Sequence, residues 1–288
     1  MSFSSDFLSR PSIESGLRGK ATADTNIAGP QTLEMFVPAD DVAEPELTIL
    51  VPALNEATTI SRFLGWCKEG IARTGAHVEI LIVDSSTDST PDIALALGAR
   101  VLRAPARGLG RAYIDATPFV RGKYVIMGDA DCTYDFRQIG PFLEALRRGA
   151  DFVMGSRFRG RIEPDAMPAL HRYFGTPATT LILNCMFHSR FSDIHCGMRG
   201  LTLDALRRMN LQSQGWEYAS EMILKSVHMR LRTEEVPIDF YRAPGGRESH
   251  MKRLGQLASH AGEWRGLFFA VAGWRTPCAR SYPIPAAV

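Results

Sequence analysis

The amino-acid sequence predicts an α/β fold in which helices cover both faces of a mostly parallel β-sheet. Short runs rich in apolar and β-branched residues alternate with longer segments of helical character. Strands that alternate with helices are typical of parallel sheets, because a helical crossover returns the chain to the same edge. Polar clusters follow three of the strand-like runs, and such sheets bind ligands at the carboxyl ends of their strands.

Five strands and four helices are expected in the first part of the fold. The runs "LTILVPA", "VEILIVD", "ARVLRA", "KYVIMGD" and "DFVMGS" are short and β-rich, and helix-like segments separate most of them. The expected strands are 47–53, 78–84, 99–104, 123–129 and 151–156, and the expected helices are 57–73, 89–97, 109–120 and 136–148.

After Arg159 the pattern becomes more helical and is interrupted by one β-like run, "RTEEVPIDFY". This part is predicted to elaborate the fold rather than to form an independent domain. No internal repeat is evident. The expected helices are 166–189, 203–210, 217–230 and 254–272.

Residues 1–45 are expected to form a disordered leader, because Ser, Thr, Ala, Gly, Pro and acids predominate there without a hydrophobic period. The folded domain is expected over residues 46–275, followed by a tail at 276–288. Within the domain, 46–158 is the sheet-forming half and 159–275 the more helical half.

Composition indicates a globular protein and excludes several classes of function. The chain has 288 residues, 45% hydrophobic and 22% charged, and a formal net charge of +2, which is too small to indicate a nucleic-acid partner. Five cysteines are odd in number and form no C-x-x-C pair, which fits a reducing cytosol. No run reaches the ~18 apolar residues of a spanning helix, and the N-terminus lacks the apolar stretch of a secretory signal. We therefore expect a cytoplasmic protein that does not cross a membrane unaided.

Three acids follow the apolar run "VIMG": Asp129, Asp131 and Asp135. A turn or a helix cap would explain one of them but not all three. A D-x-D pair can instead hold a hard divalent cation through oxygen ligands, while phosphates and water take the remaining positions. We expect Asp129 and Asp131 to bind Mg²⁺ or Mn²⁺ together with a diphosphate.

Asp84 ends the apolar run "ILIV", and "SSTDST" follows it. A capped turn is the expected role of Asp88 in that stretch. Because Asp84 lies at a strand end of the same sheet as the D-x-D pair, we expect it to recognise a nucleotide base or ribose.

Gly108 and Gly110 lie at the start of an expected helix, with Arg107 and Arg111 close to its N-terminus. Helix N-termini and arginines both favour phosphate. The two glycines are therefore predicted to contribute to nucleotide binding.

Taken in order, "VPALNE", "VDSSTDST", "GLGRA", "GDADCTYD", "GSRF" and "SDIHCGMRG" resemble the motifs of the inverting family-2 glycosyltransferases. The nearest resemblance is to the branch that makes dolichol-phosphate mannose or glucose, and it runs from about Leu47 to Leu267. It implies the GT-A fold, a Rossmann-like nucleotide-diphospho-sugar transferase sheet with a helical acceptor-side elaboration. It also implies a UDP- or GDP-linked sugar donor and a polyprenyl phosphate acceptor.

The resemblance assigns roles to individual residues on the donor side. Pro52, Glu56 and Asp84 would contact the nucleoside, and Asp129 and Asp131 would hold the metal and diphosphate. Asp131 is also predicted to act in catalysis through that metal. The chain departs from the mannose-synthase branch at Thr133, where that branch has a Gln that can help to ligate the metal.

A second group of residues is basic, and the resemblance places it around the acceptor phosphate. The alternative interpretation is a solvated surface. Where the family more often ends in "SK", this chain has "SHMK", so that a histidine stands in place of a lysine. The acceptor-phosphate residues are predicted to be Arg157, Arg172, Arg247, His250 and Lys252.

The expected reaction needs little proton chemistry. A phosphate monoester is anionic near neutral pH and can attack the anomeric carbon directly, whereas a hydroxyl acceptor needs a carboxylate base. Asp193 lies where the family places an acid near the acceptor, and it would be a base for a hydroxyl or an orienting group for a phosphate. Glu217 and Glu221 would share one helix face, with Glu221 near the site or simply solvated.

The sequence is compatible with two other functions and excludes a third. The chain could transfer sugar to a hydroxyl of a glycan or small molecule, or it could bind nucleotide sugars without catalysis. A dinucleotide-dependent dehydrogenase is excluded, because "VPALNE" contains no glycine. The segment 254–274 could be a core helix, but with a lipid acceptor we expect it to contact the inner face of a membrane, with Trp264 and Trp274 at the headgroups.

Overall fold

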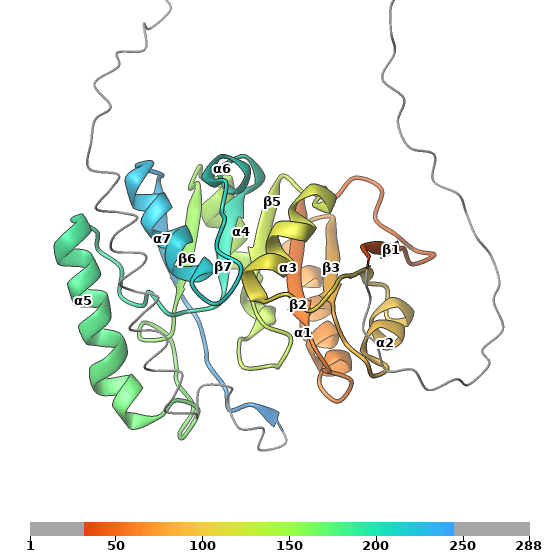
Figure 1. Cartoon of the computed structure of the whole chain (residues 1–288), viewed down its shortest axis with the longest axis horizontal. Helices are drawn as coiled ribbons and strands as arrows, with labels where there is room; N and C mark the ends of the chain where they lie inside the picture. The colour runs from red at the N-terminus through yellow and green to blue at the C-terminus, as the bar shows by residue number, and fades with distance from the viewer. Residues whose placement is uncertain (1–31, 245–288) are drawn as a thin grey trace, which may run out of the picture.

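An eight-stranded sheet forms the centre of the computed structural model, which describes residues 32–244 (Figure 1). The strands are β1 (Glu34–Phe36), β2 (Leu47–Ala53), β3 (Val78–Asp84), β4 (Arg100–Arg103), β5 (Tyr124–Met127), β6 (Phe152–Ser156), β7 (Arg199–Thr202) and β8 (Thr233–Pro237). They lie in the order β1-β4-β3-β2-β5-β7-β6-β8. The pairs formed by β2 to β5 and the pair β6–β8 are parallel, whereas β1 and β7 run antiparallel to their neighbours.

Helices cover this sheet as the sequence predicts. They are α1 (Ile60–Thr74), α2 (Thr90–Ala96), α3 (Leu109–Ala116), α4 (Ile139–Arg147), α5 (Thr176–Phe187), α6 (Leu203–Met209) and α7 (Tyr218–His228). Helix α1 packs against α2 and α4, and α7 packs against α3 and α6. β2 and β3 are buried along almost their whole length, which explains why their sequences are continuously apolar. The predicted mostly parallel α/β fold is confirmed.

Several helices start later than the sequence predicts. Helix α1 begins at Ile60 rather than at residue 57, because Glu56 to Thr59 form a turn closed by the Thr59 hydroxyl on the Glu56 carboxylate, at 2.8 Å. A short 3₁₀ segment, Phe136–Gln138, precedes α4. A π-helical segment, His171–Gly175, precedes α5.

Two strands are absent from the prediction. We expected residues 1–45 to lack structure, but Glu34–Phe36 forms β1, which pairs with the edge strand β4. β7 lies between β5 and β6 in the sheet, although residues 157–198 separate it from β6 in the sequence and residues 128–198 separate it from β5. Both are very short, and their stability comes from distant partners, so neither has a local hydrophobic pattern that would reveal it.

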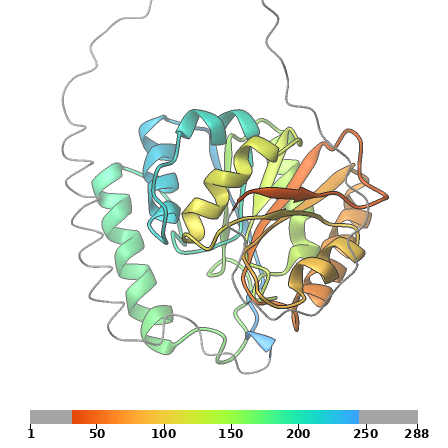
Figure 2. The same ribbon diagram turned by 45° about the vertical axis from the view of Figure 1, so that its right-hand side comes forward.

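The core is continuous through the sheet and its covering helices, with Phe63, Phe136, Phe142 and Phe152 among its largest fully buried side chains. Figure 2 shows α5 at the edge of the molecule, beside the helices of the second half. No helix within residues 32–244 is both long enough and apolar enough to span a bilayer. Five expected features lie outside the described residues: the helix at 254–272, the tail, and the acceptor residues Arg247, His250 and Lys252.

Candidate functional site

The predicted polar residues gather at one edge of the sheet, where the carboxyl ends of parallel strands meet. The register pairs Ala53 of β2 with Asp84 of β3, so the loops after these strands lie side by side. The D-x-D loop follows β5, which neighbours β2 on its other side. The loop carrying Arg157 follows β6, which runs in the same direction as β5.

Asp129 and Asp131 lie on the loop after β5 and are both partly buried. Burial, together with the negative charges of Asp131 and Glu56, raises the pKa of Asp129 to about 7. The positive charges of Arg199 and Arg157 act in the opposite direction and lower it. Within residues 32–244 neither Asp129 nor Asp131 forms an ion pair with an arginine or lysine. The loop therefore concentrates negative charge that the described protein leaves only partly compensated.

Thr133 fixes the carboxylate of Asp131. Its backbone N–H and its hydroxyl both donate to Oδ1 of Asp131, at 3.0 and 2.6 Å. The described residues offer no donor to the second oxygen, Oδ2, which is left for a ligand. Thr133, which the sequence marks only as a departure from the Gln of the mannose-synthase branch, thus orients the predicted metal ligand Asp131.

Asp135, the third acid of the run, has a structural role. Arg137 donates to both of its oxygens, at 2.7 and 2.9 Å, and the hydroxyl of Tyr241 donates to it at 3.2 Å. The Arg137 guanidinium in turn lies over the ring of Trp66, 4.7 Å from the centroid. Asp135 therefore caps the 3₁₀ segment before α4 and is not available to a metal.

The residues of the D-x-D loop fit a divalent cation. Two carboxylates, one with a raised pKa and one with an unengaged oxygen, form an oxygen donor set suited to Mg²⁺ or Mn²⁺. No three His, Cys, Asp or Glu side chains within residues 32–244 are close enough together to hold a metal. Protein ligands would thus number two, and phosphate or water oxygens would complete the coordination. Gly197 gives this loop room, since a Cβ there would lie 2.9 Å from Oδ2 of Asp129.

Asp84 is fully buried and is held by an arginine that the sequence analysis missed. Arg103, on β4 directly across from Asp84, forms an ion pair with its Oδ2 and also donates to the carbonyl of Ser86 at 3.0 Å. Oδ1 of Asp84 is buried without a hydrogen-bond partner. Burial raises the pKa of Asp84, although Ser86 and Arg103 oppose the shift. A buried acceptor without a donor is costly, so it favours a ligand that supplies an N–H or O–H.

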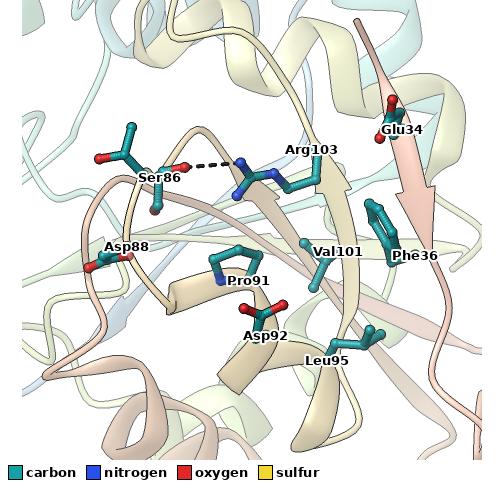
Figure 3. Close-up of a pocket in the computed structure, with 10 residues that line it drawn as sticks. Glu34, Phe36, Ser86, Asp88, Pro91, Asp92, Leu95, Val101 and Arg103 are labelled. Carbon is teal, nitrogen blue, oxygen red and sulfur yellow. Dashed lines mark hydrogen bonds between the residues drawn. The ribbon is translucent and has the colours of Figure 1, made fainter. Parts of the chain in front are cut away.

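A cavity of about 330 Å³ lies beyond this ion pair (Figure 3). Arg103 and Val101 of β4 line one side, Phe36 of β1 lies next to them, and the start of α2 lines the opposite side. The unpredicted strand β1 thus closes the space at the edge of the sheet.

Pro52 and Glu56 lie on β2 and in the loop that follows it. The Glu56 carboxylate is largely buried and accepts the Thr59 hydroxyl, while its backbone N–H donates to the Thr90 hydroxyl at 2.9 Å. Asp88 accepts both the N–H and the hydroxyl of Thr90, and so it caps the turn as predicted. These bonds join the loops after β2 and β3.

The two glycines of "GLGRA" have a packing role in this structure. Gly108 has φ of 110°, and a Cβ there would lie 2.5 Å from the carbonyl oxygen of Gln214. The N–H of Gly110 donates to the carbonyl of Gly215, and that of Arg111 to the carbonyl of Gln214, at 3.2 and 2.9 Å. Residues 213–215 therefore occupy the N-terminus of α3, where phosphate binding was expected. The local sequence pattern around Gly108 could not predict this contact, because residues 213–215 are about 100 residues away in the sequence.

Arg157 and Asp193, which the sequence assigned to different tasks, bind each other. The guanidinium donates from Nε and Nη2 to the two carboxylate oxygens at 2.7 and 2.8 Å, and the backbone N–H of Arg157 donates at 3.1 Å. His195 N–H is a further donor to Asp193, which has no exposed surface. This environment suits an orienting group better than a base.

Arg172 forms no hydrogen bond or ion pair with Arg157 or Asp193, and the structure adds another arginine to this region. Arg172 lies in the π-helical segment before α5, with its guanidinium 5.5 Å from the ring centroid of Tyr173 and in no ion pair with a described residue. Arg199 of β7, which the prediction omitted, is buried and donates to the backbone carbonyls of Cys196, Ala219 and Ile194. The positive charge of Arg199 lowers the pKa of Asp129 against the effect of burial, so Arg199 lies close to the D-x-D loop.

Glu221 also holds structure. Its carboxylate accepts the N–H groups of Gln212 and Ser213 and pairs with Lys225 at 2.7 Å. It thereby secures the loop that covers α3.

Comparison with known proteins gives a consistent result. Residues 48–209 match the family described as glycosyl transferase family 2. The low-salt glycan biosynthesis hexosyltransferase of Haloferax volcanii is 40% identical over 228 residues, which are 79% of this chain and 54% of that protein. The chain thus spans about half the length of this relative.

Other relatives carry names that include the acceptor lipid. The dolichyl-phosphate hexose transferase of Haloferax volcanii is 29% identical and covers 69% of this chain and 85% of its own length. The undecaprenyl-phosphate mannosyltransferase of Micrococcus luteus is 29% identical, with 75% and 92% covered.

Solved structures share the fold. Mannosyl-3-phosphoglycerate synthase from Rubrobacter xylanophilus superposes with a TM-score of 0.59 at 23% identity, covering 84% of this chain and 79% of that one. Glucosyl-3-phosphoglycerate synthase from Mycobacterium tuberculosis, solved with Mn²⁺, UDP and glucosyl-3-phosphoglycerate, gives 0.57 at 20% identity, with 74% and 76% covered. The predicted GT-A fold is confirmed.

Proposed function

Because this chain belongs to glycosyl transferase family 2, we propose that it transfers a hexose from a nucleotide-diphosphate sugar to a polyprenyl phosphate, with inversion. The observation that carries the proposal is the pair Asp129 and Asp131 at the carboxyl end of β5, which are partly buried and form no ion pair within residues 32–244. Relatives named for dolichyl or undecaprenyl phosphate support the acceptor.

On the donor side, Asp129 and Asp131 would hold Mg²⁺ or Mn²⁺. When bound, the cation supplies positive charge to the diphosphate leaving group. A neighbour of the same fold crystallised with Mn²⁺ and UDP supports this assignment. Asp84 would accept an N–H of the base or an O–H of the ribose through its unpartnered Oδ1, close to Pro52 and Glu56.

The donor base is not fixed by these contacts, since uracil and guanine both present an N–H. Gly108 and Gly110 would act by holding α3 against the 213–215 loop rather than by binding phosphate through the helix N-terminus.

On the acceptor side, an oxygen of the lipid phosphate would attack the anomeric carbon from the face opposite the diphosphate. One C–O bond forms and the C–O bond to the diphosphate breaks, and the diphosphate leaves with the electron pair. The phosphate needs no base, which agrees with a fully buried Asp193 held by Arg157. Nη1 of Arg157 has no hydrogen-bond partner among residues 32–244 and remains able to donate to a phosphate oxygen.

The acceptor-phosphate set in this proposal keeps Arg157 and Arg172, together with the three basic residues beyond the described part, Arg247, His250 and Lys252. The proposal also keeps one folded domain that ends at 275, but β1 moves its start from residue 46 back to Glu34. It keeps the cytoplasmic location at the inner face of a membrane, with contact through 254–274.

The proposal is tested by incubating the full chain with UDP- and GDP-linked hexoses, with Mn²⁺, Mg²⁺ or EDTA, and with or without polyprenyl phosphate. We expect lipid-dependent release of nucleoside diphosphate, a hexosyl lipid of the corresponding mass, and inverted configuration at the anomeric carbon by NMR. The Asp131→Asn variant is the matched control, because it changes one charge and little volume.

Two outcomes would replace the proposal. Release stimulated only by a sugar or alcohol would indicate a hydroxyl acceptor. Binding of nucleotide sugar without transfer to any acceptor would indicate a binding protein.

A further inference from the structure

Helix α5 and the segment before it expose an unusual amount of apolar side chain. Within residues 32–244, eleven large hydrophobic side chains are exposed, and six of them lie between residues 170 and 186. The exposed fractions reach 70% for Phe174, 68% for Leu170 and 64% for Leu181. A contiguous apolar patch on a soluble surface usually marks an interaction site. The six residues, here called the α5 outer face, are Leu170, Tyr173, Phe174, Leu181, Ile182 and Met186.

The opposite side of α5 is bound to the rest of the protein. Thr176, Thr180 and Leu183 are buried, at spacings of three and four residues that share one side of a helix. Thr179 is hydrogen-bonded to the His195 ring at 2.9 Å, and Asn184 donates to the carbonyl of Phe191 at 2.7 Å. Both partners belong to the loop before β7 that also carries Asp193. The exposed residues are therefore fixed facing outward and are not free to turn into the core.

The charges around this face have one sign. From Ala166 to Arg190 the sequence contains no Asp or Glu, and α5 itself has no charged residue. Positive charge occurs only near the two ends, at Arg172 and Arg190, with His171 and His188 beside them. An apolar helix surface with basic ends and no acid matches a bilayer that carries anionic headgroups.

We propose that the α5 outer face lies on the surface of an anionic bilayer, with the helix parallel to the membrane plane. The helix is too short to cross, since no described helix can span a membrane. Arg172, in the segment before α5, would then lie at the depth of lipid phosphates. Only this last link, between α5 and the acceptor phosphate, rests on the proposed function.

A vesicle-binding assay with the full chain tests the proposal. We expect binding to phosphatidylglycerol vesicles without any polyprenyl phosphate, and at least a tenfold loss of binding in the double variant Leu181→Asp, Ile182→Asp. Both side chains are more than half exposed, so the substitutions remove little packing from the fold. The matched control is Val37→Asp, which changes a residue that is 52% exposed on the far side of the sheet, next to β1. Equal binding by wild type and double variant would overturn the proposal.

Cys185 gives a second measurement that needs no change on the apolar face. It is exposed on α5, whereas Cys67, Cys132 and Cys196 are buried. In a Cys278→Ser background, a polarity-sensitive fluorophore on Cys185 should shift to the blue and resist iodide quenching when vesicles are added. The same label in a Val37→Cys, Cys185→Ser chain should not respond. A shift that depends on protein concentration without vesicles would show instead that a second copy covers the face.

Transfer rates measured with a short soluble prenyl phosphate, in place of a long acceptor embedded in vesicles, test this inference separately from the proposed function. The α5 double variant should match the wild-type rate with the soluble acceptor and fall at least tenfold with a long acceptor embedded in vesicles. If the wild type transfers to neither acceptor but still binds vesicles, the proposed function fails and the surface assignment stands. An equal loss with both acceptors would show that the variant damages the site itself, and the role of α5 in membrane binding would be rejected.

Discussion

Arg157 and Asp193 form a bidentate pair, with N···O distances of 2.7 and 2.8 Å and almost no exposed surface on either side chain. Their positions in the sequence are 36 residues apart, on loops that follow β6 and precede β7. The pair links the carboxyl end of the catalytic sheet to the loop that anchors α5. A substitution at either residue therefore acts first on this link.

Arg157→Ala should lower the free energy of unfolding by about 3–5 kcal/mol, because it leaves the Asp193 carboxylate buried without its cation. Chemical denaturation measured by circular dichroism checks this. The control is Arg159→Ala, since Arg159 is 54% exposed and reaches Glu235 only at 3.5 Å. A loss below about 1 kcal/mol would show that solvent reaches Asp193 in solution.

Thr133→Val should weaken Mn²⁺ binding about five- to tenfold, because it removes the hydroxyl that orients Asp131, a bond worth roughly 1 kcal/mol. Electron paramagnetic resonance of Mn²⁺ in the presence of UDP measures this without relying on turnover. Asp131→Asn should lower binding much further.

Asp135→Asn is the matched control for this loop. It should reduce stability, through loss of the Arg137 pair, but leave Mn²⁺ affinity unchanged. A large loss of metal affinity in that variant would return Asp135 to the ligand set.

Arg103→Met should lower nucleoside-diphosphate affinity about tenfold or more, because the Asp84 carboxylate loses the guanidinium that fixes it and that lowers its pKa against the effect of burial. Isothermal calorimetry with UDP and GDP gives the affinities. Arg100→Met is the control, because Arg100 lies on β4 like Arg103 but pairs with Glu79 of β3, at 2.9 Å. If Arg103→Met binds nucleotide normally while Asp84→Asn does not, Asp84 acts without help from Arg103.

Glu221→Gln should destabilise the protein at pH 7, and the difference from wild type should shrink as the pH falls below about 4.3. Burial alone would raise the pKa of Glu221, but Lys225 and the N–H groups of Ser213 and Gln212 hold it below its usual value. For an acid whose folded pKa is lowered, the stabilisation is fully present above the unfolded pKa and is lost as the pH falls through the folded value.

Thermal unfolding from pH 3 to 8 provides the measurement for Glu221. Glu69→Gln is the control, because that carboxylate is 55% exposed and 3.9 Å from Arg73. A stability difference that stays constant over the whole range would show that the carboxylate charge is not what holds the loop.

The sequence predicts those parts of the structure whose signal is local. β2, β3 and the D-x-D loop are visible because a buried parallel strand is continuously apolar and its carboxyl end carries the polar residues. Arg103 and Arg199 are not visible, since their partners are chosen by strand pairing between distant segments. The glycines of "GLGRA" show the same limit, because the carbonyls of 213–215 reach α3 only in the folded chain.

β7 has a consequence for how this enzyme family can be recombined. Arg199–Thr202 comes from the second half of the chain, yet it lies inside the sheet between β5 and β6 of the first half. The two parts to which the proposed function assigns donor and acceptor binding are therefore interleaved in the sheet and are not consecutive units. In a chimera joined near residue 158, β5 and β6 would come from one protein and β7, which must pair with both, from the other. Exchange of acceptor specificity between relatives should succeed only when β5, β6 and β7 are all taken from the same protein. The alternative is to exchange only segments outside the sheet, such as α5.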